Sequence, residues 1–572
     1  MKGMTAFSRI SDVSEYLIEE SLELFESKAS APAPKPESTF FRVTNNGWFV
    51  AAVCTLVAVC VTGGIIWAGL NPPTGRPNVI VTDTQTESED TTIEPVETTT
   101  GSEATTTEPE ETTTEPEETT TDTEAATEPV PLIPSEGLEF VSNGDGTCYV
   151  KSEGSCRDSV VVIPAVSPSG DRVTAIGKRA LSGGFMTSVV IPDSVTDIGT
   201  GAFANCAYLT DVSFGSGIAK IGMQAFDKCY SLTSVTLGNS VTSIGNFAFQ
   251  YCVALKSLTL GNGVRSIGDK VFGECTALES IQVDAANPVY RGEGNCLIEI
   301  STGTLLLGCK NTVIPDDGSV KAIGEEAFYS RKGLTSIAIP AGVQTIGYRA
   351  FHACSGLTEV TFSNGLTKID DSAFSYCTGI TGITLPDSLT TIGRSAFEGC
   401  TGLVSIDIPA GVKKISSGAF GYCSGLTRVS VAEGVSTIDS QSFRYCSSLE
   451  SIQIPSSVIG IGDDAFTECV SLTSVILPHG MTSIAKNAFS GCIQLNGIVI
   501  PTSVTEVRDF AFSECRDLTR IYYMGSLEQW ESIQIGNANH KLIPEAVYCY
   551  TETKPAEPGN YWHYVDGVPT KW

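Results

Sequence analysis

Cysteine and histidine are the residue types in this chain that most directly suggest chemistry, and there are 19 cysteines and four histidines among 572 residues. Side chains of these types bind zinc when they converge, and two thiols at a suitable distance form a disulfide. Twelve cysteines instead recur singly, each three positions after a phenylalanine: Cys206, Cys229, Cys252, Cys275, Cys354, Cys377, Cys400, Cys423, Cys446, Cys469, Cys492 and Cys515. One cysteine per repeat does not converge on a point, so this spacing argues against a metal site.

Stacked repeats would place equivalent cysteines in a column. Their Cβ atoms would lie about 4.8 Å apart, beyond the roughly 3.5–4.5 Å that a disulfide prefers. A free cysteine in such a column behaves as a small apolar side chain. We therefore expect these twelve cysteines to be buried and unreactive. One repeat has Arg331 in place of the cysteine.

Two further cysteines, Cys296 and Cys309, lie at equal distances from Thr302 and Gly303 in the segment NCLIEISTGTLLLGC. If Thr302 and Gly303 form the turn of a β-hairpin, the two cysteines face each other as a non-hydrogen-bonded pair, in which side chains approach most closely. The spacing therefore predicts a disulfide between Cys296 and Cys309.

The histidines do not complete a catalytic or metal site. They lie far apart in the sequence, at His352, His479, His540 and His563. The chain has no HExxH, G-x-S-x-G or Walker A motif. We therefore expect no enzymatic activity, no cofactor and no metal ion.

The cysteine column belongs to a longer pattern. A dipeptide ending in phenylalanine occurs thirteen times, in a run from Phe203 to Phe272 and a second from Phe328 to Phe512, always at steps of 23 residues. Each unit reads approximately A-F-x-x-C-x-x-L-T-x-V-x-L-P-x-x-V-x-x-I-G. The pattern predicts a short strand at L-T-x-V-x-L, a second inward edge at V-x-x-I-G and a helical turn at A-F-x-x-C. A single unit cannot bury its own apolar face, so the units must stack as a solenoid.

This 23-residue pattern resembles the BspA-like leucine-rich repeats of bacterial surface proteins. The resemblance implies a leucine-rich-repeat stack of short parallel strands with helical turns. It implies an N-terminal cap at 137–180, repeats at 181–522 with a hairpin insertion near 284–314, and a C-terminal cap at 523–550, where Trp530 would cover the last repeat. It also implies adhesion to host or cell-surface macromolecules.

The residues before the repeats have a different composition. Residues 1–46 are mixed in charge, residues 47–70 carry no charged side chain, and residues 71–136 hold 17 acids against one arginine. The uncharged run is long enough to cross a hydrocarbon core of about 30 Å, and it predicts an uncleaved transmembrane signal anchor. Basic residues before it predict a cytoplasmic tail at 1–46 and an extracellular repeat domain. The Thr-, Glu- and Pro-rich segment 71–136 predicts a disordered stalk.

Three groups of side chains are candidate ligand contacts. Ile476, Val499 and Tyr522 occupy the outward strand position of three successive repeats, and this strip is either a ligand contact or a surface that the C-terminal cap covers. On the opposite side, Tyr422 and Tyr445 are neighbours. The tail 551–572 predicts an aromatic hairpin that resembles one copy of the repeats that bind cell-wall polymers, although the hairpin could instead dock on the solenoid. Its aromatic residues are Tyr561, Trp562, Tyr564 and Trp572.

The sequence thus predicts a single-pass plasma-membrane protein whose repeats bind a protein or a glycan on the strand face. The alternatives are a cell-wall or carbohydrate-binding structural protein and a sensor that signals through the cytoplasmic tail. The net charge of −30 argues against a nucleic-acid partner, because phosphate backbones require a basic surface. The sequence predicts neither the identity of the ligand nor the oligomeric state.

Overall fold

A computed structural model describes residues 133–572 of the chain. The predicted cytoplasmic tail and signal anchor, and the predicted stalk up to residue 132, lie outside this range. Among residues 133–572, no helix is long and apolar enough to span a membrane. The described residues belong to one compact unit.

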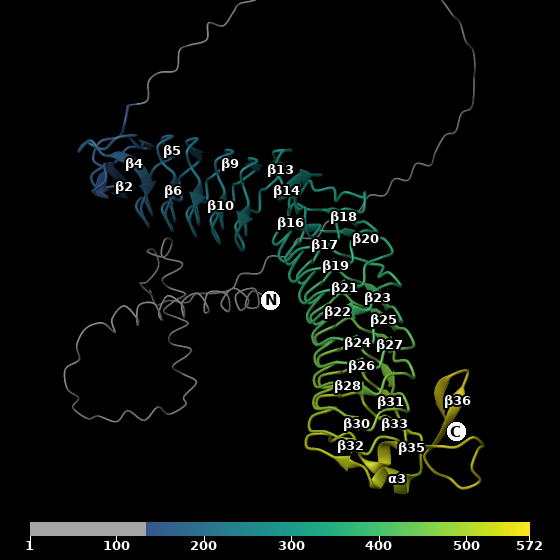
Figure 1. Cartoon of the computed structure of the whole chain (residues 1–572). Helices are drawn as coiled ribbons and strands as arrows, with labels where there is room; N and C mark the ends of the chain where they lie inside the picture. The colour runs from purple at the N-terminus through teal and green to yellow at the C-terminus, as the bar shows by residue number, and fades with distance from the viewer. Residues whose placement is uncertain (1–132) are drawn as a thin grey trace, which may run out of the picture. The chain divides into compact units, whose positions relative to one another are not determined.

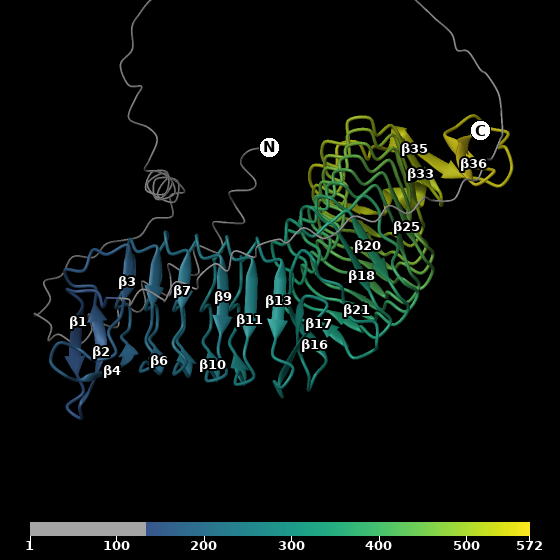
Figure 2. The same ribbon diagram turned by 90° about the horizontal axis from the view of Figure 1, so that it is seen from above.

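Two columns of short strands run along this unit (Figures 1 and 2). The first column, here called the strand face, is formed by the L-T-x-V-x-L segments, which pair in parallel with their neighbours. Its strands are β3 (Val160–Val162), β5 (Ser188–Val190), β7 (Asp211–Ser213), β9 (Ser234–Leu237), β11 (Ser257–Leu260), β13 (Ser280–Val283), β18 (Ser336–Ile339), β20 (Glu359–Phe362), β23 (Ser405–Ile408), β25 (Arg428–Val431), β27 (Ser451–Gln453), β29 (Ser474–Ile476), β31 (Gly497–Ile500), β33 (Arg520–Tyr523) and β35 (Val547–Tyr550).

The second column, here called the second edge, is formed by the V-x-x-I-G segments. Its strands are β4 (Arg172–Ile176), β6 (Asp197–Ile198), β8 (Lys220–Ile221), β10 (Ser243–Ile244), β12 (Ser266–Ile267), β17 (Ala322–Ile323), β19 (Thr345–Ile346), β21 (Lys368–Ile369), β22 (Thr391–Ile392), β24 (Lys414–Ile415), β26 (Thr437–Ile438), β28 (Gly460–Ile461), β30 (Ser483–Ile484), β32 (Glu506–Val507) and β34 (Gln534–Ile535). Alternate side chains point into the core, so that Val235 and Leu237 of β9 are buried while Thr236 is exposed. The predicted solenoid is confirmed.

The A-F-x-x-C segments are not helical, contrary to the expectation. They form turns, and the residues just before the alanine and just before the cysteine have a positive φ, 55° at Gln224 and 60° at Lys228 in one repeat. Alternate N–H groups therefore point toward the next repeat, and the Phe226 N–H donates to the Ala248 carbonyl at 2.7 Å. The Lys228 N–H likewise donates to the Gln250 carbonyl at 2.8 Å. A helical turn would direct these donors along its own segment instead.

Side chains in fixed columns also join each repeat to the next. The phenylalanine rings stack, with centroids 4.8 Å apart for Phe328 and Phe351, close to the spacing of paired strands. In several repeats a threonine precedes the strand and donates its hydroxyl to the preceding repeat, as Thr233 does to the Thr210 carbonyl at 3.2 Å. This bond explains why threonine recurs in the repeat pattern.

The strand face is interrupted after β13 by an antiparallel insertion of three strands. These are β14 (Tyr290–Glu293), β15 (Cys296–Glu299) and β16 (Thr304–Gly308). Because the insertion separates the two runs of repeats, the buried residues form one core cluster on each side of it. Strand β16 then pairs in parallel with β17 and restarts the second edge.

The predicted disulfide between Cys296 and Cys309 is absent, and both thiols are free. The hairpin turn spans residues 300–303 rather than Thr302 and Gly303 alone, which shifts the pairing by two residues, and a β-bulge then shifts it back by one. As a result Cys296 lies opposite Gly308, and its thiol donates to the Glu293 carbonyl at 2.9 Å. The prediction assumed a two-residue turn, whereas the chain forms a four-residue turn, so counting from Thr302 and Gly303 gave the wrong pair.

Arg331 joins the two core clusters. It replaces the repeat cysteine, and only 1% of its surface is exposed. Its guanidinium donates to the carbonyls of Phe272 at 3.3 Å, Cys275 at 2.9 Å and Gly308 at 3.1 Å. These carbonyls belong to the repeat before the insertion and to the insertion itself, so one side chain ties together segments 56 residues apart.

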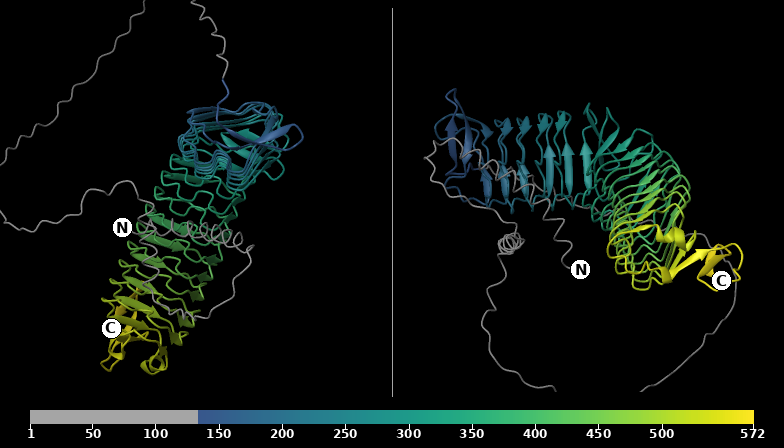
Figure 3. Two further views of the ribbon diagram at one scale, coloured as in Figure 1. Left: turned by 90° about the vertical axis from the view of Figure 1, so that its left-hand side faces the viewer. Right: turned by 90° about the horizontal axis from the view of Figure 1, so that it is seen from below.

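An antiparallel strand ends the second edge at the start of the stack, and another ends the strand face at the C-terminal end (Figure 3). At the start, β1 (Glu139–Ser142) pairs with β2 (Thr147–Ser152), and the register is irregular. After the last repeat come α3 (Leu527–Glu531), η1 (Pro544–Ala546) and a hairpin of β36 (Tyr561–Val565) and β37 (Val568–Lys571). Trp530 of α3 is buried against Tyr523, as expected for a plug over the last repeat. Pro569 leaves β37 without one backbone N–H.

Candidate binding surface

The outward side chains of the strand face form a regular column of small, mostly hydroxylic groups. All of them are exposed or half-buried: Ser213, Thr236, Thr259, Gln282, Ala338, Thr361, Thr384, Asp407, Ser430 and Gln453. The column arises because the paired strands keep the same register from one repeat to the next. It presents hydroxyl, amide and carboxylate groups to solvent along the stack.

The expected apolar strip at the C-terminal end of this column is mostly covered. Ile476 is 44% exposed, whereas Val499 is 1% exposed. Val499, Tyr522 and Trp562 form a small core cluster of their own. Of the two interpretations of the strip, the structure supports covering by the C-terminal segment for Val499 and Tyr522. Only Ile476 remains available to a ligand.

Trp562 anchors the terminal hairpin on the strand face. Its indole N–H donates to the Tyr523 carbonyl at 2.9 Å, and its ring lies 5.3 Å from Tyr522 and 4.9 Å from Tyr564, centroid to centroid. The hairpin therefore docks on the solenoid. The Tyr561 side chain is half-buried, so the exposed member of this group is Trp572, at 39%. Trp572 stacks on His563 and donates its indole N–H to the Thr551 hydroxyl at 2.7 Å.

Tyr422 and Tyr445 come together as the sequence suggested. Their rings stack with centroids 5.0 Å apart, and the Arg444 guanidinium lies 4.9 Å from the Tyr445 ring centre. Both tyrosines are half-buried on the turn side of the stack. Two repeats earlier, Tyr376 in the same column covers Gly399, whose added Cβ would lie 2.7 Å from the Tyr376 ring.

The repeat cysteines form a ladder of sulfur hydrogen bonds. Each thiol donates to a carbonyl of the preceding repeat, as Cys400 does to Phe374 at 3.2 Å and Cys446 to Phe420 at 3.2 Å. Burial raises the pKa of Cys400 to about 12. Because the thiolate is the reactive form, these cysteines are suited to packing rather than to chemistry.

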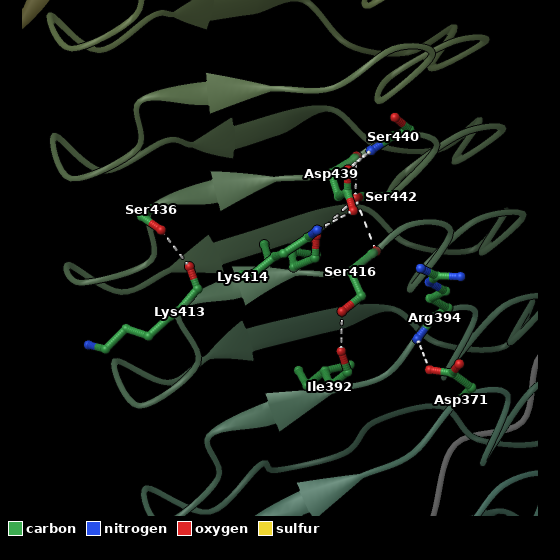
Figure 4. Close-up of polar contacts among 11 residues, drawn as sticks. Asp371, Ile392, Arg394, Lys413, Lys414, Ser416, Ser436, Asp439, Ser440 and Ser442 are labelled. Atoms are coloured by element: carbon green, nitrogen blue, oxygen red, sulfur yellow. Dashed lines mark hydrogen bonds and ion pairs between the residues drawn. The ribbon is translucent and has the colours of Figure 1, made fainter.

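The second edge uses its polar side chains to join repeats (Figure 4). Lys414 forms an ion pair with Asp439 of the next repeat at 2.6 Å. The Ser436 hydroxyl donates to the Lys413 carbonyl at 3.0 Å. Most of the polar groups drawn in this view are engaged between neighbouring repeats, so this edge offers a ligand fewer free groups than the strand face.

A groove that the sequence did not indicate opens on the strand face beside the insertion. Its volume is about 300 Å³, at the lower end of the range for ligand sites. Residues 312–314 form one wall, and the outward sides of β18 and β20 form the other. The interrupted repeat period was the available signal, but the period alone does not show how far the two walls separate. Among residues 133–572, no group of three or more His, Cys, Asp or Glu side chains is placed to hold a metal ion.

Comparison with known proteins places this architecture among bacterial repeat proteins. The family model described as a BspA type leucine-rich repeat region matches residues 174–290, 321–448 and 413–540. A leucine-rich repeat protein from Bacteroides ovatus is 30% identical over 71% of this chain and 98% of its own, with a TM-score of 0.53. A leucine-rich cell surface protein from Faecalibacterium prausnitzii is 28% identical over 72% of this chain and 99% of its own, with a TM-score of 0.42. None of the curated proteins matches the chain significantly.

Proposed function

Because the chain belongs to the BspA-type leucine-rich-repeat family, we propose that it is a surface-displayed, membrane-anchored binding protein that adheres to host or cell-surface macromolecules. Leucine-rich-repeat families are typically binding proteins rather than enzymes. In this proposal the uncharged run at 47–70 is the anchor, and the repeats lie outside the cell.

The observation that carries the proposal is the outward column of the strand face. Its side chains are small and exposed, whereas polar groups of the second edge bond to neighbouring repeats. A broad surface of small groups admits the close approach of a macromolecule, and its hydroxyls and amides offer donors and acceptors along its length. We expect a protein or a glycan to bind there.

The test is a binding assay with the full-length chain against immobilised extracellular-matrix proteins. Thr236→Arg places a bulky charge on the strand face, and Ser216→Arg places the same group on an exposed turn outside that face. We expect capture by the unmodified chain and by Ser216→Arg, and a loss of roughly tenfold or more for Thr236→Arg. Equal capture by both variants would show that the binding site does not include this part of the strand face.

A cell-wall or carbohydrate-binding function is the second candidate, because Trp572 exposes 39% of its surface beside His563. An exposed indole is a suitable surface for a sugar ring. Trp572→Ala should abolish retention on purified cell-wall glycan if this function holds, while thermal melting shows the fold unchanged. Full retention by this variant would contradict the carbohydrate function.

A further inference from the structure

Strand β18 has a paired neighbour on one side only. It pairs in parallel with β20, and these two strands form a separate sheet. On its other side run residues 312–316, which form no strand. Among the described residues, no backbone hydrogen bond joins 312–316 to β18. The strand face is therefore split at this point, and β18 has an open edge inside the repeat array.

The regular repeats show which groups of β18 are left open. Ser336 is the register equivalent of Glu359, whose N–H donates to the preceding repeat at the Thr335 carbonyl, 3.3 Å away. In a parallel ladder the residues that face one neighbour alternate along the strand, so Ala338 faces the same side as Ser336. The N–H and carbonyl groups of Ser336 and Ala338 consequently point toward the groove.

The insertion holds the opposite wall of the groove in place. Thr312 donates its hydroxyl to the Asn295 carbonyl, and the Val313 N–H donates to the Gly294 carbonyl, both at 2.8 Å. Gly294 has a φ of 60°, and an added Cβ would lie 1.9 Å from the Val313 carbonyl oxygen. Only glycine fits there. The separation of the two walls is thus fixed before any ligand binds, which lowers the entropic cost of binding.

The lining of the groove combines apolar and acidic chemistry. Val313 is 71% exposed, and Ala338 and Thr361 are also exposed. The Glu359 carboxylate has no ion pair among the described residues. Glu359 lies one strand beyond β18, so a strand added at the open edge would be about 10 Å from it, a distance that two long side chains bridge.

We propose that this groove binds an extended strand of a partner protein, which pairs with the open edge of β18 and directs a lysine or arginine toward Glu359. Backbone donors and acceptors that alternate along an open strand are matched by another polypeptide strand and by no regular feature of a glycan. This inference rests on the proposed adhesive function. It adds to that function the part of the strand face that recognises the partner and the chemistry of that partner.

The test uses the full-length chain and a fluorescent peptide of sequence Thr-Val-Lys-Val-Thr-Val with blocked ends. Ala338→Pro removes an N–H that the free chain does not use, and edge strands accept proline. Glu359→Lys reverses the charge beside the groove, and Asp407→Lys makes the same change on the strand face outside it. Binding is read by fluorescence anisotropy, and hydrogen exchange is followed across residues 334–341.

We expect the peptide to bind the unmodified chain and to slow exchange in 334–341. Ala338→Pro should weaken binding roughly tenfold, Glu359→Lys about fivefold, and Asp407→Lys less than twofold. A peptide methylated on alternate backbone nitrogens should not bind, which tests strand pairing even if Ala338→Pro fails to fold. Unchanged affinity for the methylated peptide or for a folded Ala338→Pro chain would overturn the proposal.

Two further outcomes separate this inference from the function on which it rests. If the chain captures matrix proteins but does not bind the peptide, the adhesive function is supported and the proposal that the groove binds a strand is refuted. If the chain binds the peptide but captures no matrix protein, strand binding in the groove is supported and the adhesive function is refuted. Dimerisation of the free chain that Ala338→Pro abolishes would assign the open edge to a second copy, and would also overturn the proposal.

Discussion

Replacing Arg331 should loosen the connection between the two runs of repeats. Arg331→Met keeps the length and the apolar stem of the side chain but removes the guanidinium. Three buried carbonyls, at Phe272, Cys275 and Gly308, then lose their donor. At about 1 kcal/mol for each hydrogen bond, the free energy of unfolding should fall by about 3 kcal/mol. Burial lowers the pKa of Arg331, and the desolvation cost that the charge no longer incurs offsets part of this loss.

The lost free energy is concentrated at the boundary between the two core clusters. In a stack that is stabilised by contacts between nearest neighbours, a weak boundary uncouples the unfolding of its two sides. We therefore expect urea unfolding of Arg331→Met, followed by circular dichroism under reducing conditions, to show two transitions where the unmodified chain shows one.

The matched control is Arg349→Met, one repeat farther along. The Nε of Arg349 is buried without an acceptor, so this substitution removes no comparable set of bonds. It should change the unfolding midpoint little and leave the shape of the transition as it is. If Arg331→Met behaves like Arg349→Met, the three carbonyl bonds do not couple the two clusters.

Three other predictions follow from burial. Trp562→Ala should cost about 3–5 kcal/mol of docking free energy, so limited proteolysis should release the tail at unchanged repeat stability; a resistant tail would contradict the anchoring role. With a pKa of about 12, Cys400 has about one thiolate in ten thousand at pH 8, and iodoacetamide should modify it only after denaturation. Burial raises the pKa of Asp227 to about 6 from 3.8, so the folded state holds a proton that the unfolded state has released. The melting temperature should therefore fall as pH rises between these values, and Asp227→Asn should remove that slope.

The stack itself was predictable because its determinants repeat. A phenylalanine every 23 residues fixes the period, and alternating apolar positions fix which faces of the strands are buried. The turn conformation was not predictable in the same way. A-F-x-x-C suggests a helical turn by spacing, but bonding between repeats requires the N–H of Phe226 to reach Ala248, and that contact exists only in the stack.

The candidate site was predictable only in part. Tyr422 and Tyr445 were paired correctly because equivalent positions of adjacent repeats must be neighbours. The burial of Val499 depended on where Trp562 docks, which no repeat rule describes. The error at Cys296 arose from the length of the hairpin turn, and the groove at β18 arose from how far the insertion holds residues 312–314 from that strand. These three failures lie at the insertion and at the C-terminal end, where the repeat period is broken.

The antiparallel strands at the two ends have a consequence for how this molecule behaves at high concentration. A parallel stack is a template that could add further repeats, or a second molecule, without limit. Here the last strand, β37, runs in the opposite direction, lacks an N–H at Pro569 and carries Lys571, and the first strand, β1, has an irregular register. The second edge at the start of the stack and the strand face at its end are therefore closed to parallel pairing with a second molecule.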